Sequence, residues 1–140
     1  MIARDALIAE ALTWVGTPFR RNQMCKGVGA DCIGVVVGAG LAVGVKLDYY
    51  NTYSPVPDGS LRRELLKQFD KVFLRPEAYV APEPGDILMM SFEAEPHHVA
   101  LYIGEDIVHA YMAVRRCVRQ PYSAAWRSRV MGIFRFRGVA

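Results

Sequence analysis

The hydrophobic pattern of this chain changes its period once, at a turn marked by Pro82, Pro84 and Gly85. Before the turn, apolar residues recur at helical spacing over residues 3–15 and 60–73. After the turn, short apolar runs have the composition of strands. These runs span residues 87–92, 99–103, 107–112 and 130–136, with a short helical turn expected within 122–128. Helices first and strands later predict an α+β fold in which N-terminal helices pack on an antiparallel β-sheet.

The first predicted helix, residues 3–15, is amphipathic and ends at the glycine-proline turn 16–18. Two neighbouring apolar stripes run along it, formed by Ile8, Leu12 and Val15, and by Leu7, Ala11 and Trp14. The segment 19–30 that follows is punctuated by glycine and is expected to be an irregular loop. A turn-rich connection is expected over residues 48–59, which contain two prolines.

Asp31 is expected to cap a second helix over residues 32–44, because its carboxylate can accept hydrogen bonds from the amides of the first turn. Four glycines in this segment weaken the helix on its own. They stand at positions 34, 38, 40 and 44. Because they carry no side chain, this helix can lie very close to a sheet.

The size and composition fit one globular domain over residues 1–140. Hydrophobic residues make up 52% of the chain, enough to bury a core, which excludes a disordered tail or linker. The longest uncharged run, residues 32–45, is too short to cross a bilayer, so we expect no membrane insertion. Arg4, Asp5 and Glu10 interrupt the N-terminal stretch where a signal peptide would be apolar. The sequence therefore predicts synthesis in the cytoplasm without an export signal.

Positive charge is concentrated at the C-terminal end of the chain. The formal net charge is +3, yet residues 111–140 contain no acidic residue. Seven arginines lie there, at positions 115, 116, 119, 127, 129, 135 and 137. This bias suits an anionic partner such as a carboxylate-bearing polymer or an acidic protein surface. A solvated edge, or an interface within an assembly, explains it equally well. No basic run is interleaved with aromatic residues, so we expect no nucleic-acid partner.

The three cysteines, Cys25, Cys32 and Cys117, do not form a disulfide framework, because their number is odd and their spacing wide. Cys32 directly follows the predicted cap Asp31, in the first turn of a helix. Amides and the helix dipole favour a thiolate there, although the charge of Asp31 opposes it. A nearby imidazolium would be needed to offset that charge, and most buried cysteines are inert.

Two histidines are predicted to share one face of the sheet. If Gly104 and Glu105 form a two-residue hairpin turn, Ala100 pairs with His109, and His98 points to the same face as Ala100. The Cβ atoms of His98 and His109 would then lie roughly 7 Å apart on a diagonal. The neighbouring histidine at position 97 would point the other way, to the surface.

A helix with Cys32 at its start could pack on this histidine face, and the three side chains would then form a nucleophile, a base and an orienting group. His98 would take the thiol proton and later donate it to a leaving amine. His109 would fix the ring of His98, and backbone amides around Cys32 would form part of an oxyanion hole.

Other interpretations of these residues remain open. Cys32 and the two histidines could bind zinc, although they follow no compact metal spacing and a fourth ligand is not obvious. The histidines could also be ordinary surface residues of a hairpin. The glycines of GVGADCIG do not form a phosphate loop, because no Lys-Ser or Lys-Thr follows them.

Several motifs in this order resemble the NlpC/P60 family of cysteine peptidases. They are WVGTPFR, ADCIG, PGDIL, HVALYIG and IVHAY, and they extend from residue 11 to about residue 112. The chain ending AAWRSRVMGIFRFRG is most similar to the branch of the family found in phage tails and gene transfer agents.

The resemblance implies a papain-like α+β core and hydrolysis of amide bonds in peptidoglycan stem peptides, usually the bond between D-glutamate and the diamino acid. It assigns the nucleophile to Cys32, the base to His98 and the third polar residue to His109, without a metal or cofactor. Phe19, Arg20 and Asp31 are expected near the substrate or the oxyanion. Phe19 stands where the family often has tyrosine, and Arg20 begins a dipeptide that replaces Trp-Gly, so the pocket wall differs and could favour a substrate carboxylate.

The resulting prediction is a peptidoglycan endopeptidase carried at the tip of a phage or phage-like tail. Its expected partners are peptidoglycan stem peptides and the hub proteins of a tail tip or baseplate. As part of the virion it would act at the cell wall. The alternative is a structural tail-tip or baseplate protein that retains the fold with little or no turnover. Acyl transfer by the same triad is a third possibility, since hydrolysis and transfer share the acyl-enzyme.

Overall fold

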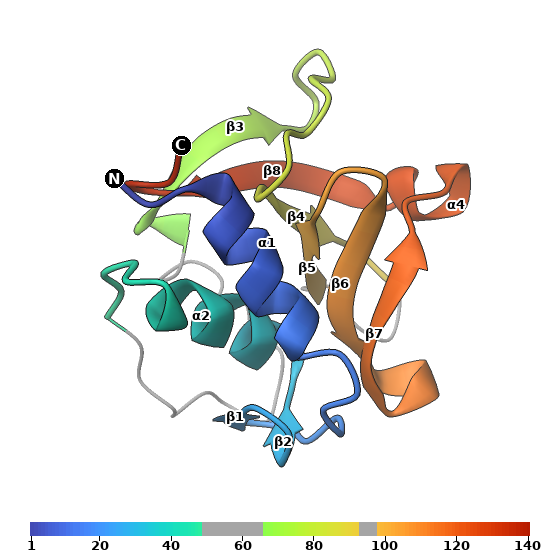
Figure 1. Cartoon of the computed structure of the whole chain (residues 1–140). Coiled ribbons are helices and arrows are strands. Elements are labelled where there is room, and N and C mark those ends of the chain that lie inside the picture. The colour runs from blue at the N-terminus through green and yellow to red at the C-terminus, as the bar shows by residue number, and fades with distance from the viewer. Residues whose placement is uncertain (49–65, 93–97) are drawn as a thin grey trace.

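The computed structural model describes residues 1–48, 66–92 and 98–140 (Figure 1). Two helices, α1 (Arg4–Thr13) and α2 (Cys32–Ala42), lie beside a six-stranded antiparallel sheet. The sheet has the strand order β3-β8-β4-β5-β6-β7. Its strands are β3 (Phe69–Leu74), β4 (Ile87–Met90), β5 (His98–Tyr102), β6 (Asp106–Tyr111), β7 (Arg116–Pro121) and β8 (Val130–Phe136). The predicted α+β class is confirmed.

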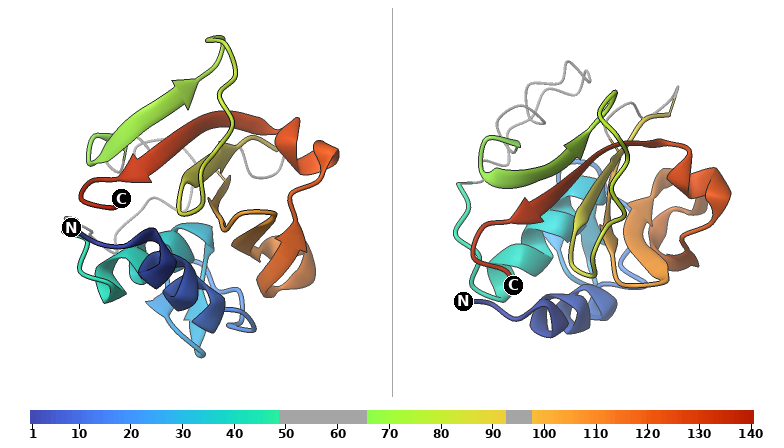
Figure 2. Two further views of the ribbon diagram at one scale, coloured as in Figure 1. Left: turned by 45° about the horizontal axis from the view of Figure 1, so that its top comes forward. Right: turned by 90° about the horizontal axis from the view of Figure 1, so that it is seen from above.

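Smaller elements complete the described part of the chain. A two-stranded ladder, β1 (Met24–Cys25) with β2 (Gly29–Ala30), lies in the segment predicted to be an irregular loop. A 3-10 turn η1 (Met112–Val114) links β6 to β7, and the short helix α4 (Ala124–Arg127) precedes β8 where a helical turn was expected. The two ends of the chain lie side by side in both views of Figure 2, because Ile2 pairs with Val139.

Helix α1 packs on α2 through one of its two predicted stripes. Leu7, Ala11 and Trp14 are buried, whereas Val15, from the other stripe, is 43% exposed. Trp14 also lies over Gly38 of α2, where a Cβ atom would overlap its indole ring. The glycine at position 38 therefore lets the two helices approach closely.

The capping prediction for α2 is confirmed. Asp31 accepts a hydrogen bond from the amide of Gly34 at 2.8 Å, and the helix begins at Cys32. Residues 34–40 of the helix are buried and pack against the sheet, where Phe136 covers Gly40, whereas Leu41 is exposed. The helix ends at Ala42, two residues before the predicted end at position 44.

The prediction of a helix over residues 60–73 is wrong for its last part. Residues 69–74 form strand β3, which pairs with β8. Phe69 and Phe73 are buried there, and the ring of Phe69 meets Phe136 edge-on at 5.2 Å. Burial of two aromatic rings against β8 outweighs the helical spacing of the sequence. The segment 49–65, including most of the predicted connection and the start of this helix, lies outside the described residues.

The two faces of the sheet carry different clusters. Helices α1 and α2 pack on the face that bears Leu101, Val108 and Ala110. The residues that alternate with these, such as Ala100 and Ile107, belong to a second cluster formed by the other face of the sheet and by Trp126. The core is therefore split into two layers by the sheet, and one layer contains no residue of α1 or α2.

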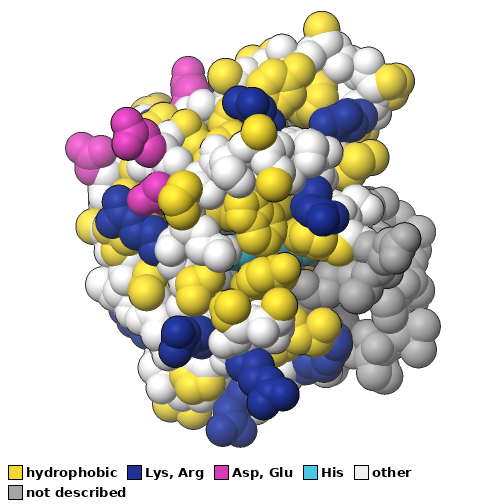
Figure 3. All heavy atoms as spheres, turned by 90° about the vertical axis from the view of Figure 1, so that its right-hand side faces the viewer, with side chains coloured by type: hydrophobic (Ala, Val, Ile, Leu, Met, Phe, Trp, Pro, Cys, Tyr) yellow, Lys and Arg dark blue, Asp and Glu magenta, His cyan; other side chains and the backbone are white. Residues whose placement is uncertain are grey.

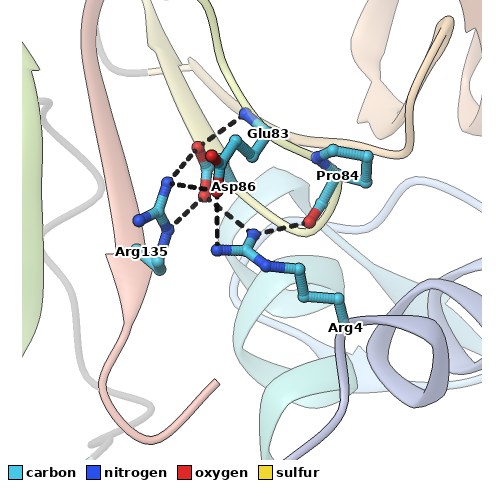
Figure 4. A network of polar contacts seen from close by, with 5 residues as sticks. All are labelled: Arg4, Glu83, Pro84, Asp86 and Arg135. Atoms are coloured by element: carbon cyan, nitrogen blue, oxygen red, sulfur yellow. Dashed lines mark hydrogen bonds and ion pairs between the residues drawn. The ribbon is translucent and has the colours of Figure 1, made fainter. Parts of the chain in front are cut away.

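A buried carboxylate joins α1 to two central strands (Figure 4). Asp86, just before β4, is fully buried, and Arg135 of β8 donates to its two oxygens at 2.7 and 2.9 Å. Arg4 of α1 reaches the same carboxylate at 3.5 Å and the carbonyl of Pro84 at 2.7 Å. Glu83 donates its amide to Asp86 at 2.9 Å. The Pro-Gly-Asp turn thus serves as an anchor between the helices and the sheet.

Candidate active site

The hairpin of β5 and β6 has the predicted register. Leu101 pairs with Val108, and the amide of Ile103 donates to the carbonyl of Asp106 at 2.9 Å across the turn. Gly104 has a φ of 124°, a backbone conformation that residues other than glycine rarely adopt. This register places His98 and His109 on the same face of the sheet, as expected.

The two histidines form a direct hydrogen bond. Nε2 of His98 lies 2.6 Å from Nδ1 of His109, and both side chains are buried, with exposed fractions of 1% and 0%. The short distance means that one of these nitrogens carries a hydrogen and the other a lone pair. The orienting contact predicted between His109 and His98 is therefore present.

A third residue, which the sequence analysis missed, extends this chain of contacts. Nε2 of His109 lies 2.7 Å from Oε1 of Gln120. Gln120 comes from β7, where it pairs with Ile107, so it shares the face of His109. Strand β7 was not predicted because its sequence, RCVRQP, is polar and ends in proline, as an exposed edge strand can be. Cys117 and Val118 are adjacent apolar residues, so the polarity of this segment does not alternate as it would in a half-buried strand, and no sequence signal marked it.

Aromatic rings enclose the histidine pair. Tyr111 stacks on His109 at 5.2 Å with an interplanar angle of 11°, and Trp126 meets His109 edge-on at 4.9 Å. Phe92 meets His98 edge-on at 5.4 Å. These contacts fix both imidazole planes and keep them in apolar surroundings.

Burial keeps both imidazoles neutral. Desolvation, followed by the charge of His109, lowers the pKa of His98 to about 3. Desolvation also lowers the pKa of His109, while its hydrogen bond to Gln120 acts in the opposite direction. At neutral pH His98 is thus an unprotonated imidazole, the form that a general base requires. The imidazolium that the sequence analysis invoked to offset Asp31 is not favoured by these surroundings.

The predicted nucleophile lies at the start of α2, partly buried. Helix α2 contacts both β5 and β6, the strands that carry the two histidines. The expectation that it packs on the histidine face is wrong, because its contacts fall on the opposite face with Leu101 and Val108. His98 is the first residue of β5. A meeting of the Cys32 thiol with His98, at the end of the strands where the two faces join, stays a prediction.

Asp31 has a local structural role. Its carboxylate is nearly buried and accepts the amides of Gly34 at 2.8 Å and Asn22 at 2.9 Å. It thereby fastens the preceding loop to the first turn of α2. A carboxylate held in this way positions the residue that follows it, Cys32, whereas a direct contact with substrate stays a prediction.

Phe19 and Arg20 lie on the loop that borders this helix start. Phe19 forms an isolated bridge with Ala30 and donates its amide to the carbonyl of Arg115 at 2.9 Å. Arg20 is exposed, and its side chain covers Gly29. Phe19 thus lies beside Ala30 and Arg20 beside Gly29, the two residues that precede Asp31, and their role as a wall of the site stays a prediction.

Figure 3 shows the face that carries β6, β7 and α4, and histidine is visible at the floor of a hollow near its centre. Hydrophobic side chains surround the opening, and lysine and arginine side chains stand around it at several points. Acidic side chains are confined to one margin of this view. The rim of the hollow is thus apolar, and the charged side chains around it are mostly basic.

The remaining candidates are placed as follows. Cys25 is exposed on β1, and Cys117 is buried on β7, where desolvation raises its pKa to about 12. The histidine at position 97 lies outside the described residues. Within the described ranges, no three or more His, Cys, Asp or Glu residues are grouped as metal ligands would be. In the same part of the chain, no helix has the length and apolar character needed to cross a membrane.

Comparison with known proteins places this architecture. Solved structures with a similar fold include an NlpC/P60 family protein from Bacillus cereus, with 20% identity and a TM-score of 0.69 over 95% of this chain and 40% of that one. The NlpC/p60 domain of the peptidoglycan hydrolase SagA has 22% identity and a TM-score of 0.62, over 94% of this chain and 97% of that one. The peptidoglycan hydrolase RipB from Mycobacterium tuberculosis has 20% identity and a TM-score of 0.59, over 94% and 63%.

The chain spans 40% of the length of the Bacillus cereus protein, so these likenesses concern the fold of a domain. A comparison with curated proteins gives no match. The sequence model of the NlpC/P60 family matches residues 13–135, nearly the whole chain. That stretch includes the start of α2, both histidines and Gln120, and it shows that the chain belongs to the NlpC/P60 family.

Proposed function

We propose that this protein is a cysteine peptidase that hydrolyses amide bonds in peptidoglycan stem peptides, with the bond between D-glutamate and the diamino acid as its target. Family membership supports the reaction class. The observation that carries the proposal is the buried hydrogen bond of 2.6 Å between His98 and His109, at the end of strands contacted by α2. A thiol peptidase needs a nucleophilic cysteine and a neutral, oriented imidazole as its base, and Cys32 with His98 would supply both.

In the proposed reaction, the Cys32 thiol gives its proton to His98 as its sulfur attacks the scissile carbonyl carbon. The tetrahedral oxyanion is stabilised by backbone amides in the first turn of α2, whose dipole favours negative charge there. His98 then returns the proton to the leaving amine as the C–N bond breaks. A water molecule, deprotonated by His98, releases the acyl group from Cys32.

The surroundings of the site support an acidic substrate. The hollow above the histidines has an apolar rim, and most of the charged side chains around it are basic (Figure 3). Arg20 lies on the loop fastened to Asp31, where it could attract the carboxylates of a stem peptide. Phe19, on the same loop, would contribute an apolar wall.

The biological setting is a further part of the proposal. The resemblance of the C-terminal segment to the phage-tail branch supports a protein made in the bacterial cytoplasm and carried to the wall in a phage or phage-like tail. The arginines that do not stabilise the fold would then dock to a hub protein of the tail tip or baseplate. Residues 1–140 would act as one catalytic domain in that assembly.

A digest of defined muropeptides, followed by mass spectrometry, tests the reaction. We expect the wild type to remove the stem beyond D-glutamate and the Cys32→Ala variant to give no product. Cys25→Ala is the matched control, since it removes an exposed thiol from β1 and should retain full activity. If neither wild type nor control yields product and Cys32 is unreactive to alkylation, the peptidase proposal is wrong and a structural tail protein with a peptidase fold is favoured.

A further inference from the structure

Gln120 is placed to decide which nitrogen of each histidine carries the hydrogen. Its Oε1 lies 2.7 Å from Nε2 of His109, and Nδ1 of His109 lies 2.6 Å from Nε2 of His98. Gln120 is half-buried on β7, and both imidazoles are buried. The three side chains thus form one linear hydrogen-bonded chain across β7, β6 and β5.

Gln120 presents its amide oxygen, Oε1, to His109, and this orientation favours one assignment of the hydrogens. Because an amide oxygen only accepts hydrogen bonds, Nε2 of His109 carries a hydrogen in this arrangement. A neutral His109 then has its lone pair at Nδ1, and Nε2 of His98 must donate to it. We infer that Gln120 is a positioning residue that sets both tautomers, leaving the lone pair of His98 at Nδ1.

The rings that pack on the two histidines are aromatic. Tyr111 stacks on His109, Trp126 meets its edge, and Phe92 meets His98, so the described neighbours of the two rings are largely apolar. Burial also disfavours the doubly protonated forms, in which both ring nitrogens would donate. Gln120, on the edge strand β7, therefore fixes the donor and the acceptor in both hydrogen bonds of the histidine pair.

The consequence for catalysis rests on the proposed function. The proton of the Cys32 thiol moves to Nδ1 of His98 as the S–C bond forms, giving an imidazolium whose Nε2–H still points at His109. The same proton moves from Nδ1 to the amine nitrogen as the C–N bond breaks. In the opposite tautomer Nδ1 already carries a hydrogen and cannot accept the thiol proton. Gln120 touches neither substrate nor thiol and acts through the two histidines.

Long-range ¹H–¹⁵N correlation spectra of the intact, ¹⁵N-histidine-labelled protein test the assignment directly. We expect both His98 and His109 to show a protonated Nε2 and an unprotonated Nδ1 at pH 7. Only three histidines are present, so a variant at position 97, His97→Gln, identifies the third set of signals. A protonated Nδ1 on either buried histidine would overturn the inference.

Two substitutions separate positioning from packing. Gln120→Glu keeps the acceptor oxygen, so the tautomers should persist. Gln120→Leu keeps the approximate volume but removes the acceptor, and His109 should then show a mixture of tautomers. We expect Gln120→Leu to lower kcat roughly 10-fold with KM within about twofold, because it removes part of the 10²–10⁴-fold contribution of a positioned base.

Gln68→Leu is the matched control. Gln68 bonds to the backbone of Asp48, outside the histidine chain, so its loss should alter neither tautomers nor kcat. The two proposals fail separately. If the spectra show the expected tautomers but muropeptides are not cleaved, the proposed function is wrong and the assignment stands. If cleavage occurs with the opposite tautomers, or if Gln120→Leu leaves both tautomers and kcat unchanged, the role of Gln120 is wrong.

Discussion

At the scale of single residues, the three cysteines stand in three different surroundings. Cys117 is buried, with a pKa raised to about 12, whereas Cys25 is exposed and Cys32 starts a helix. Since the thiolate is the reactive form, we expect iodoacetamide to modify Cys32 faster than Cys25 at mildly acidic pH, and Cys117 only after unfolding. Mass spectrometry of peptides after timed alkylation measures the three rates. Equal rates for all three cysteines in the native protein would favour the structural tail protein.

The buried histidines also make the stability of the fold depend on pH. Their folded-state pKa values are lowered, that of His98 to about 3, so the unfolded chain binds protons that the folded chain excludes. The stability from keeping them neutral is present above their unfolded pKa of about 6.5 and is lost as the pH falls toward 3. We expect the free energy of unfolding to fall by up to about 1.4 kcal/mol per pH unit for each histidine.

Urea unfolding at several values between about pH 6.5 and 4.8 measures this slope, in a window above the ordinary range of carboxylates. His98→Asn is the control variant, since it removes one titrating group from the pair. Its slope should be shallower than that of the wild type. Identical slopes would mean that folding does not lower the pKa of His98.

At the scale of elements, the buried Asp86 joins α1, β4 and β8 through Arg4 and Arg135 (Figure 4). Asp86→Asn removes the charge that two partly buried guanidinium groups share. We expect the free energy of unfolding to fall by about 2–3 kcal/mol. This is less than for a fully buried ion pair, because both arginines keep some access to water. Urea unfolding provides the measurement.

Asp70→Asn is the matched control for Asp86→Asn. Asp70 on β3 also pairs with an arginine, Arg137, but at 3.4 Å and with its side chain 62% exposed. Its loss should cost about 0.5 kcal/mol or less. A similar cost for both substitutions would show that the Asp86 network contributes nothing beyond a surface ion pair.

Sequence patterns within short windows predicted much of this fold. The elements that they missed depend on pairing between strands that are distant in the sequence. The cap at Asp31 and the register of β5 and β6 depend on a carboxylate three residues from an amide and on the turn at Gly104, both readable in a short window. Strand β3 was mistaken for helix because its burial depends on β8, more than fifty residues away. Gln120 was missed with its edge strand, since nothing within RCVRQP indicates the neighbour that it contacts.

At the scale of the whole molecule, the arginines of the C-terminal segment divide into two groups. Some stabilise the fold, because Arg119 pairs with Asp106, Arg135 with Asp86 and Arg137 with Asp70. Arg115 follows η1 and Arg116 begins β7; both are exposed, and no carboxylate of the described residues forms an ion pair with them. The charge bias of the sequence is therefore partly structural and partly available to a partner.

The available group lies beside the loop of the site, since Arg115 and Arg116 pair through their backbones with Phe19 and Pro18. We expect the double variant Arg115→Asn/Arg116→Gln to raise KM for acidic muropeptides roughly three- to tenfold at about 50 mM salt, with kcat unchanged, because fixed positive charge attracts the substrate before the reaction. Asparagine suits position 115, where φ is 60°.

The control carries the same change of charge at the other edge of the sheet. Lys71→Gln/Arg137→Gln removes two exposed cations, one on β3 and one directly after β8, that pair with Glu77 and Asp70. Steady-state kinetics at about 50 and 500 mM salt compare the two double variants with the wild type, since exposed charges are screened at the higher concentration. The difference in KM between the Arg115→Asn/Arg116→Gln variant and the wild type should shrink at the higher salt concentration. The KM of the control should match that of the wild type at both concentrations. Equal effects of both variants would mean that net charge alone attracts the substrate, so that neither edge of the sheet recognises it.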